Sequence, residues 1–384
     1  MPQINGKAGF TDNFALPTQL LPGEAFGQEG QIPVKFGVRY GVNAGVEANQ
    51  MLFNMELFQS LRKLDAAKST YKLQTLATVE DLVYQVIQVY IQHQITQEQE
   101  DILNSNLTRV DQLVTIAQAQ FENGIIKKLD VDQLRVNRTN LSSELSNLKI
   151  GAEQQLNLLR FYLALDMDKP MVLSEKLNGT DRYPLSPELM LSENINFQLL
   201  QHQKTLNYLE GRTIKAGFYP KLSAVAQYNY TGQMDEFGFK SPNYSSFGAG
   251  LWGLSVSIPI FDGLQKVRKI QENKLKMKQL EYQEEYLEKS SKMEFQNARV
   301  KIDLNNELVT TQEANMELAQ GLYDVTKQSY QEGVAPLTEL LNAETSLKEA
   351  QSPYLTALLN FKLAELEHVK VSGQLAKLIQ STND

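Results

Sequence analysis

Residues 46–123 read VEANQMLFNMELFQSLRKLDAAKSTYKLQTLATVEDLVYQVIQVYIQHQITQEQEDILNSNLTRVDQLVTIAQAQFEN, a run without glycine or proline. These two residues punctuate secondary structure, so their absence predicts one continuous element. The run is rich in Leu, Gln, Glu and Ala, which favour helix. We expect a helix over residues 54–121, roughly 100 Å long at a rise of about 1.5 Å per residue. A helix this long cannot fold back on a small globule and must lie along other long helices.

A second run without glycine or proline covers residues 264–320 and predicts another long helix. Each long helix is followed by a turn, at Gly124 and Gly333, and then by a further helical segment, 129–165 and 337–375. Apolar residues recur at steps of three and four, as they do in helices that meet along a coiled-coil seam. The sequence therefore predicts two long antiparallel hairpins, together with a shorter helix at 187–217.

Strands are predicted outside the helical runs. Residues 34–48 alternate between apolar and polar or glycine positions, which is typical of a strand with one apolar face. Similar alternation predicts strands at 222–230 and 247–258 and, more weakly, at 4–10. Four strands cannot close a barrel, and an open sheet cannot face lipid with unpaired edges. Two interpretations stay open: a soluble sheet, which alternation alone favours, or one barrel to which several chains contribute.

The two halves of the chain repeat the same order of features. GVEANQMLFN at 45–54 aligns with GLSVSIPIFD at 253–262, and FENGIIKKLDV at 121–131 aligns with YQEGVAPLTEL at 330–340. Each half is predicted to run strand, loop, strand, long helix, turn and helix, with loops at 11–33 and 231–246. Only the second half is preceded by a helix, because Met1 aligns with Tyr219. We therefore expect that this chain lacks an N-terminal segment with a signal peptide and helices.

Composition excludes several classes of protein. The 37 basic and 45 acidic residues give a net charge of −8, which argues against a nucleic-acid binder. Because the chain has no cysteine, disulfides, thiolate metal sites, cysteine nucleophiles and a lipidated cysteine are excluded. The histidines are isolated from one another, and no catalytic, cofactor-binding or metal-binding motif stands out. We expect no enzymatic activity, no cofactor and no metal.

Three motifs carry a resemblance to a known family. They are AGFYPKLS at 216–223, VSIPIFDG at 256–263, and the duplicated turn with an aromatic residue, a glycine and an acid at 121–130 and 330–339. In their order, spacing and duplication, they make the chain similar to TolC-type outer-membrane efflux proteins over nearly its whole length. The resemblance marks as strand–helix junctions Phe53, Asn54, Pro220, Pro259, Phe261, Asp262 and Gly263.

The resemblance implies a mostly helical α+β fold and a homotrimer in the bacterial outer membrane, extending into the periplasm. Each copy would give four strands to a shared barrel of twelve strands and its hairpins to a periplasmic α-helical tunnel. The implied partners are outer-membrane lipid, a periplasmic adaptor protein and an inner-membrane transporter. The implied function is passive export of small molecules, or of unfolded protein in type I secretion. The corresponding divisions are 1–53 and 218–262 for the strand pairs, 54–170 and 263–384 for the hairpins (with a C-terminal segment), and 171–217 for an equatorial segment and helix.

The two turns would form the periplasmic tips, where members of the resembled family hold the duct closed. By position, Tyr330 and Asp130 match a closing pair, and Glu339 matches an acid of a ring that lines the constriction. Asn342 stands where a second acid is often found. The complete set of candidate tip residues is Phe121, Gly124, Asp130, Tyr330, Gly333, Glu339 and Asn342.

Two alternatives stay open beside this interpretation. An acid near the start of a helix is favoured by the helix dipole, so Asp130 and Glu339 have a structural explanation that needs no gate. A soluble coiled-coil scaffold or adaptor protein with a small β-domain would share much of the same layout. Long apolar strand faces, present in two copies, favour the export duct over the scaffold.

Overall fold

The computed structural model of the chain describes residues 2–27, 29–173, 175, 185–237 and 244–375. It divides into two compact units, Met1–Ala67 with Lys204–Lys278, and Lys68–Gln203 with Gln279–Asp384. The α-helices are α1 (Met55–Glu122), α2 (Lys128–Tyr162), α3 (Ile195–Ala216), α4 (Gln265–Gln331) and α5 (Leu337–Val371). None of the described helices combines the length and hydrophobicity that crossing a bilayer requires.

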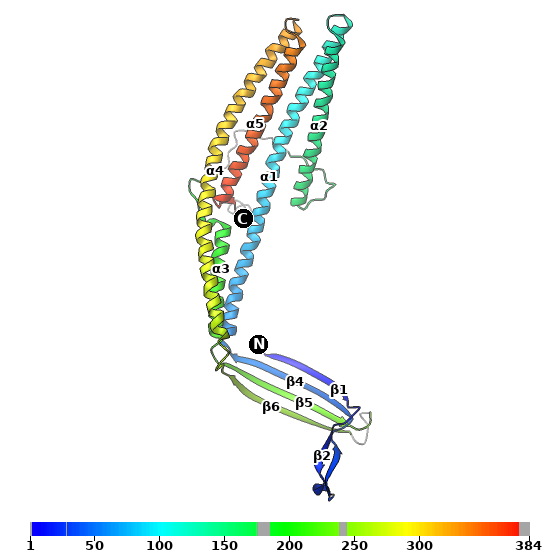
Figure 1. Cartoon of the computed structure of the whole chain (residues 1–384), viewed down its shortest axis with the longest axis vertical. Helices are drawn as coiled ribbons and strands as arrows, with labels where there is room; N and C mark the ends of the chain where they lie inside the picture. Colours follow the sequence, from blue (N-terminus) through cyan, green and yellow to red (C-terminus); the bar gives the residue numbers. More distant parts are fainter. Residues whose placement is uncertain (1, 28, 174, 176–184, 238–243, 376–384) are drawn as a thin grey trace. The chain divides into compact units, whose positions relative to one another are not determined.

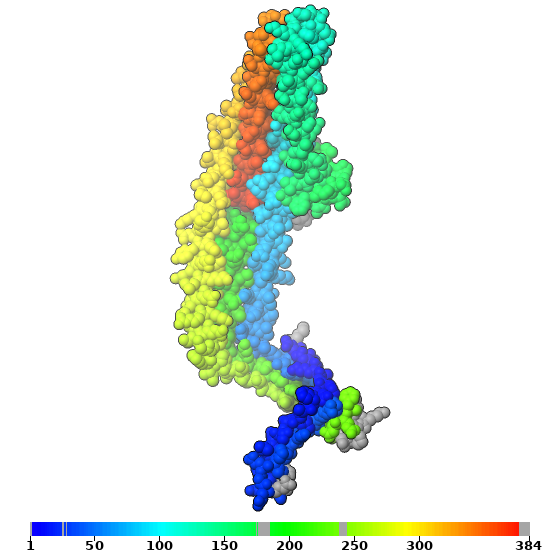
Figure 2. Space-filling model, turned by 45° about the vertical axis from the view of Figure 1, so that its right-hand side comes forward, coloured from blue at the N-terminus to red at the C-terminus, as the bar shows by residue number. Residues whose placement is uncertain are grey.

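The two predicted long hairpins are confirmed. In the second unit α1 turns back into α2, and α4 turns back into α5 (Figure 1). One buried apolar cluster joins all four helices beside the turns, formed by Leu113, Ala117, Val131, Leu134, Tyr323, Tyr330, Leu337, Leu340, Ala343 and Leu347. Figure 2 shows the two turns packed side by side. Both hairpins therefore end in a single four-helix core.

Two helices end before their predicted limits. α2 stops at Tyr162 rather than residue 165, because Ala164 takes a left-handed backbone conformation with φ of 52°. α5 stops at Val371 rather than residue 375, and Gly373 beyond it has φ of 80°. A residue in this region ends an α-helix by reversing the backbone.

The shorter predicted helix at 187–217 begins eight residues late, since α3 starts at Ile195. Its start is set by Asn194, whose side-chain oxygen accepts hydrogen bonds from the backbone N–H groups of Asn196 and Phe197 at 3.0 and 3.2 Å. An asparagine in this position satisfies amides that the first helical turn leaves unbonded. Part of the predicted segment 171–217, residues 174 and 176–184, lies outside the described residues.

The first unit contains an antiparallel sheet in the order β1 (Gln3–Asp12), β4 (Tyr40–Phe53), β5 (Lys221–Met234) and β6 (Ser245–Ser257). The predicted strands at 4–10, 222–230 and 247–258, together with the later part of the one predicted at 34–48, therefore belong to one sheet. Its register aligns Ile4, Ala48, Ala226 and Trp252 in one row across the strands, and Asn5, Glu47, Gln227 and Leu251 in the next. Because side chains alternate between faces, the apolar row and the largely polar row lie on opposite sides.

The predicted single strand at 34–48 is wrong. The extended segment is interrupted between β3 (Gln31–Lys35) and β4. β3 pairs instead with β2 (Thr18–Pro22) in a separate two-stranded hairpin (Figure 1). Gly37 causes the break, because its φ of 101° is incompatible with an extended strand. Consequently the predicted loop at 11–33 is also wrong in part, since it contains β2, the start of β3 and a 3-10 helix at Gly23–Phe26. The predicted loop at 231–246 lies partly outside the described residues.

Candidate functional site at the two helical turns

The turns at Gly124 and Gly333 have the same backbone geometry. Gly124 has φ of 72°, its N–H bonds the carbonyl of Phe121 at 2.9 Å, and the N–H of Ile125 bonds the carbonyl of Gln120 at 2.9 Å. This pair of hydrogen bonds is a Schellman motif, which ends a helix at a left-handed residue. Both candidate glycines therefore sit where a residue without a side chain is favoured.

The second turn repeats this motif at equivalent residues. Gly333 has φ of 77°. Its N–H donates to the backbone carbonyl of Tyr330 at 3.0 Å, and the N–H of Val334 donates to the backbone carbonyl of Ser329 at 2.9 Å. Phe121 and Tyr330 thus occupy the same position in the two turns. Tyr330 is buried with 5% exposure, whereas Phe121 is 38% exposed.

The acids that follow the turns differ in their contacts. One Asp130 carboxylate oxygen accepts a hydrogen bond from the backbone N–H of Lys127 at 3.1 Å. The equivalent N–H does not exist in the second turn, because Pro336 precedes α5. Glu339 lies exposed in the first turn of α5. The dipole explanation therefore fits Asp130 well, and a gating role for either acid stays a prediction.

Tyr330 makes its hydrogen bond to a residue that the sequence analysis did not single out. Its phenolic oxygen lies 3.2 Å from the side-chain oxygen of Gln120, on the other hairpin. Burial raises the pKa of Tyr330, and the nearby charge of Asp130 adds to this rise. Tyr330 and Asp130 are thus close enough to interact electrostatically, but each makes its hydrogen bond elsewhere. Gln120 could have been found as the residue that precedes Gly124 by four, equivalent to Ser329.

Glu339 and Asn342 lie three residues apart on an exposed face of α5. Leu340 and Ala343, beside them in the sequence, are buried in the four-helix core with 0% and 5% exposure. The two polar side chains therefore lie away from the contact between the hairpins.

The predicted junction residues include two helix caps. The side-chain oxygen of Asn54 accepts the N–H of Leu57 at 3.2 Å at the start of α1. A carboxylate oxygen of Asp262 accepts the backbone N–H of Lys266 at 3.2 Å beside the start of α4. The same carboxylate forms an ion pair with the side-chain ammonium of Lys266 at 3.1 Å. Gly263 has φ of 65°, and Pro220 and Pro259 flank β5 and β6. Phe53 and Phe261 are both exposed, at 40% and 80%.

Comparison with known proteins shows which proteins this chain resembles. The family model described as outer membrane efflux protein matches residues 210–374, which include the second junction and the second turn. The toluene efflux pump outer membrane protein TtgF of Pseudomonas putida is 22% identical over 97% of this chain and 75% of its own length. The alkaline protease secretion protein AprF of Pseudomonas aeruginosa is 23% identical over 80% of this chain and 66% of its own. By these matches the chain is similar to outer-membrane efflux proteins of the TolC type.

The solved structures agree with this assignment in fold. The outer membrane channel CmeC of Campylobacter jejuni superposes with a TM-score of 0.73 at 15% identity, covering 99% of this chain and 81% of CmeC. The likeness shows that this chain has the fold of that channel protein. The alternative of a soluble scaffold has no counterpart among these likenesses. Among the described residues, no cluster of three potential metal ligands occurs.

Proposed function

We propose that three copies of this chain form one passive export duct, closed at its periplasmic end by the two helical turns. The open edges of the sheet carry this proposal. In the described residues β1 pairs only with β4, and β6 pairs only with β5, so both edges present unbonded backbone groups. The apolar face exposes Trp252, Leu254 and Val256 at 83%, 66% and 62%. Such a face suits lipid only if neighbouring copies pair the edges and close the barrel.

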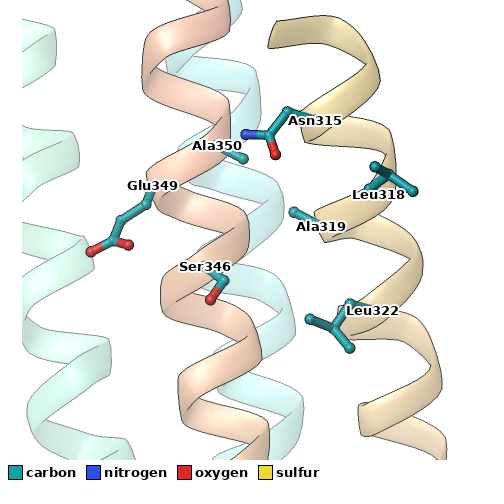
Figure 3. Close-up of a pocket in the computed structure, with 7 residues that line it drawn as sticks. All are labelled: Asn315, Leu318, Ala319, Leu322, Ser346, Glu349 and Ala350. Atoms are coloured by element: carbon teal, nitrogen blue, oxygen red, sulfur yellow. The ribbon is translucent and has the colours of Figure 1, made fainter. Parts of the chain in front are cut away.

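An exposed apolar row on α4 supports contact between copies. Leu304, Leu308, Leu318, Leu322 and Val325 are 40% to 75% exposed. They follow one another at steps of four, ten, four and three residues, which places them on one face of the helix. This is the spacing of a helix whose coiled-coil partner lies on another chain. The row borders a groove of 360 Å³ between α4 and α5, shown in Figure 3 and lined by Asn315, Leu318, Ala319, Leu322, Ser346, Glu349 and Ala350.

α2 offers the complementary surface for such a contact. Leu129, Val136 and Ile150 are 62%, 60% and 59% exposed, and they lie on one face because they are separated by multiples of seven residues. We propose that this face of one copy packs on the α4 row of the next. The equal lengths of α2 and α5, 35 residues each, and the matching turns support an internal repeat that would place six similar hairpins around the tunnel.

The turns would dock on a periplasmic adaptor that links the duct to an inner-membrane transporter. Ile125 and Val334 occupy equivalent positions in the two turns and are 70% and 78% exposed. Exposed apolar side chains on a loop tip are typical of a docking surface. The names of the relatives place those proteins in a pump and in a secretion system, which favours the same kind of partners here.

We propose small apolar molecules as the exported substrates, with unfolded protein as the alternative. The match to the toluene efflux protein covers more of both chains than the match to the protease secretion protein, which favours the former. The duct would carry out no chemistry of its own. The test is to delete the gene, restore it on a plasmid, and measure tolerance to toluene beside secretion of protein. Restored solvent tolerance supports the proposal, and restored protein secretion alone selects the alternative.

A further inference from the structure

A row of polar side chains crosses the contact between the hairpin α1/α2 and the hairpin α4/α5. The surrounding contact is apolar and includes Leu113, Leu340 and Leu347, which are at most 1% exposed. The polar row takes residues from all four helices: Asn106 and Arg109 of α1, Asn137 of α2, Tyr323 of α4, and Glu344 and Gln351 of α5.

Arg109 is the centre of this row. Its guanidinium carbon lies 5.1 Å from the centre of the Tyr323 ring, on the other hairpin, and one guanidinium N–H donates to the side-chain oxygen of Asn106. Tyr323 is 1% exposed, so this cation–π contact is shielded from water. The positive charge of Arg109 also favours the ionised form of Glu344, which otherwise loses solvation through burial.

Besides the Arg109–Tyr323 contact, two hydrogen bonds of the row join the hairpins. Asn106 donates to the side-chain oxygen of Gln351 at 3.1 Å, and both residues are buried, with 4% and 9% exposure. Asn137 donates to a Glu344 carboxylate oxygen at 3.0 Å. Each of these contacts needs one register of the two hairpins, whereas a row of leucines packs acceptably in several registers.

The row and the turns lie on the same faces of the helices. Tyr323 and Tyr330 are seven residues apart on α4, two helical turns along one face, and both belong to the four-helix core. Sliding one hairpin past the other would break the contact between Arg109 and Tyr323 and would also separate Tyr330 from Gln120.

We propose that Arg109 is a positioning residue of the gate. It fixes the register of the two hairpins and thereby preserves the hydrogen bond between Tyr330 and Gln120. This inference rests on the proposed function in one respect, that the turns form the gate. Arg109 touches no exported molecule and acts through the relative position of the hairpins.

The matched control is Arg138, which pairs with Asp111 between α1 and α2 of the same hairpin. Arg109→Ala therefore removes a contact between hairpins, and Arg138→Ala removes one within a hairpin. Since the chain has no cysteine, Asn123→Cys and Glu332→Cys give a clean pair of reporters, one on each turn. The rate at which a bis-maleimide joins them within one chain reports how closely the turns are held, without requiring transport.

The expected result is that Arg109→Ala lowers this rate by about tenfold, because the shielded cation–π contact with Tyr323 is lost, while Arg138→Ala changes it by less than about twofold. Ion conductance of the full assembly in a lipid bilayer is expected to rise in the same variant. Joining Asn106→Cys to Gln351→Cys by oxidation in the Arg109→Ala background, without the two reporter cysteines, is expected to restore the low conductance. Restoration would be specific to a positioning role, because a general loss of packing is not repaired by one bond.

Equal cross-linking rates in Arg109→Ala and Arg138→Ala would overturn the proposal. If Arg109→Ala does not assemble, Tyr323→Phe, which keeps the ring, is compared with Tyr323→Leu, which removes it; equal rates in these two would also overturn it. A changed cross-linking rate with no conductance in any variant would support the positioning role and contradict the proposed duct.

Discussion

The phenol of Tyr330 on α4 and the side-chain amide of Gln120 on α1 form a hydrogen bond of 3.2 Å that joins the two helical turns. Each residue precedes a left-handed glycine, by three positions for Tyr330 and by four for Gln120. The bond therefore links two helix ends whose backbone geometry is the same. Through it one hairpin can hold the other beside the turns.

Loss of this contact is expected to loosen the gate without harming assembly. Gln120→Ala leaves the buried Tyr330 hydroxyl without its acceptor, at a cost of about 1–3 kcal/mol. We expect higher ion conductance of the closed assembly in planar bilayers. Gln118→Ala is the control, since the hydrogen bonds of Gln118 stay within its own hairpin: it donates to Glu122 at 2.7 Å and accepts from Arg135 at 3.1 Å. Indistinguishable conductance in the two variants would remove Tyr330 and Gln120 from the gate.

Substitution of the turn glycines is expected to impair export. Gly124→Val or Gly333→Val places a β-branched residue at φ of 72° or 77°, which costs about 1–2 kcal/mol or more. The turn would rearrange while the sheet stays intact, so transport falls and the trimer persists on native gels.

The helix interior provides the control for these variants. Gly321→Ala in α4 meets no atom within 4 Å and has no left-handed backbone, so it is expected to stabilise the helix by about 0.5–1 kcal/mol. Unchanged efflux in the valine variants would remove the assignment of the turns as tips.

The stability of the four-helix core is expected to depend on pH through Glu344. Burial raises the pKa of this carboxyl, while Arg109 of α1, Asn137 of α2 and Lys348 of α5 lower it; Tyr323 of α4 is a further titratable neighbour. Because the folded pKa lies above the unfolded one, the folded state takes up the proton more readily. The contribution of Glu344 to stability is therefore complete below the unfolded pKa and is lost as the pH rises through the folded pKa.

Glu344→Gln isolates this effect. The melting temperature of the wild-type protein, relative to that of the variant, should rise by about 2 °C or more as the pH falls from neutral towards 4.5. Glu349→Gln, at an exposed position of the same helix, is the matched control. A pH profile of Glu344→Gln parallel to that of the wild type would contradict the buried state of this carboxyl.

The two strand–helix caps are expected to contribute equally. Asn54→Ala and Asp262→Ala each remove an acceptor for a first-turn amide and are expected to lower the melting temperature. Thermal unfolding of the detergent-extracted protein measures the loss. Because Asp262 also pairs with Lys266, a much smaller effect at Asp262 than at Asn54 would show that the equivalence drawn from the repeat is wrong.

The helices were predictable because they depend on the local residue composition. Absence of glycine and proline over residues 46–123 leaves a chain of helix-favouring residues no place to turn, and Gly124 then supplies the one conformation that ends it. The break before β4 was not predictable from polarity, because Gly37 fits the polar side of an alternating strand as well as it fits a reversal. The late start of α3 depends on Asn194, whose capping role a smooth helical pattern conceals.

The contacts between the two hairpins could not be predicted from the spacing of residues in the sequence. Gln120 and Tyr330 are 210 residues apart, and neither stands out among the many glutamines and tyrosines of the long helices. Arg109 was equally hidden, since an arginine on a helix face is usually solvated. Only its contact with the buried ring of Tyr323 in the four-helix core distinguishes Arg109 from the solvated arginines.

The most direct test of the central claim is the mass of the full-length protein, extracted from the membrane fraction in detergent and measured by light scattering with the detergent subtracted. A mass of three chains is the expected result, because the sheet leaves two edges to be paired and α4 leaves an apolar row to be covered. A monomer from that fraction would contradict the shared barrel and with it the duct.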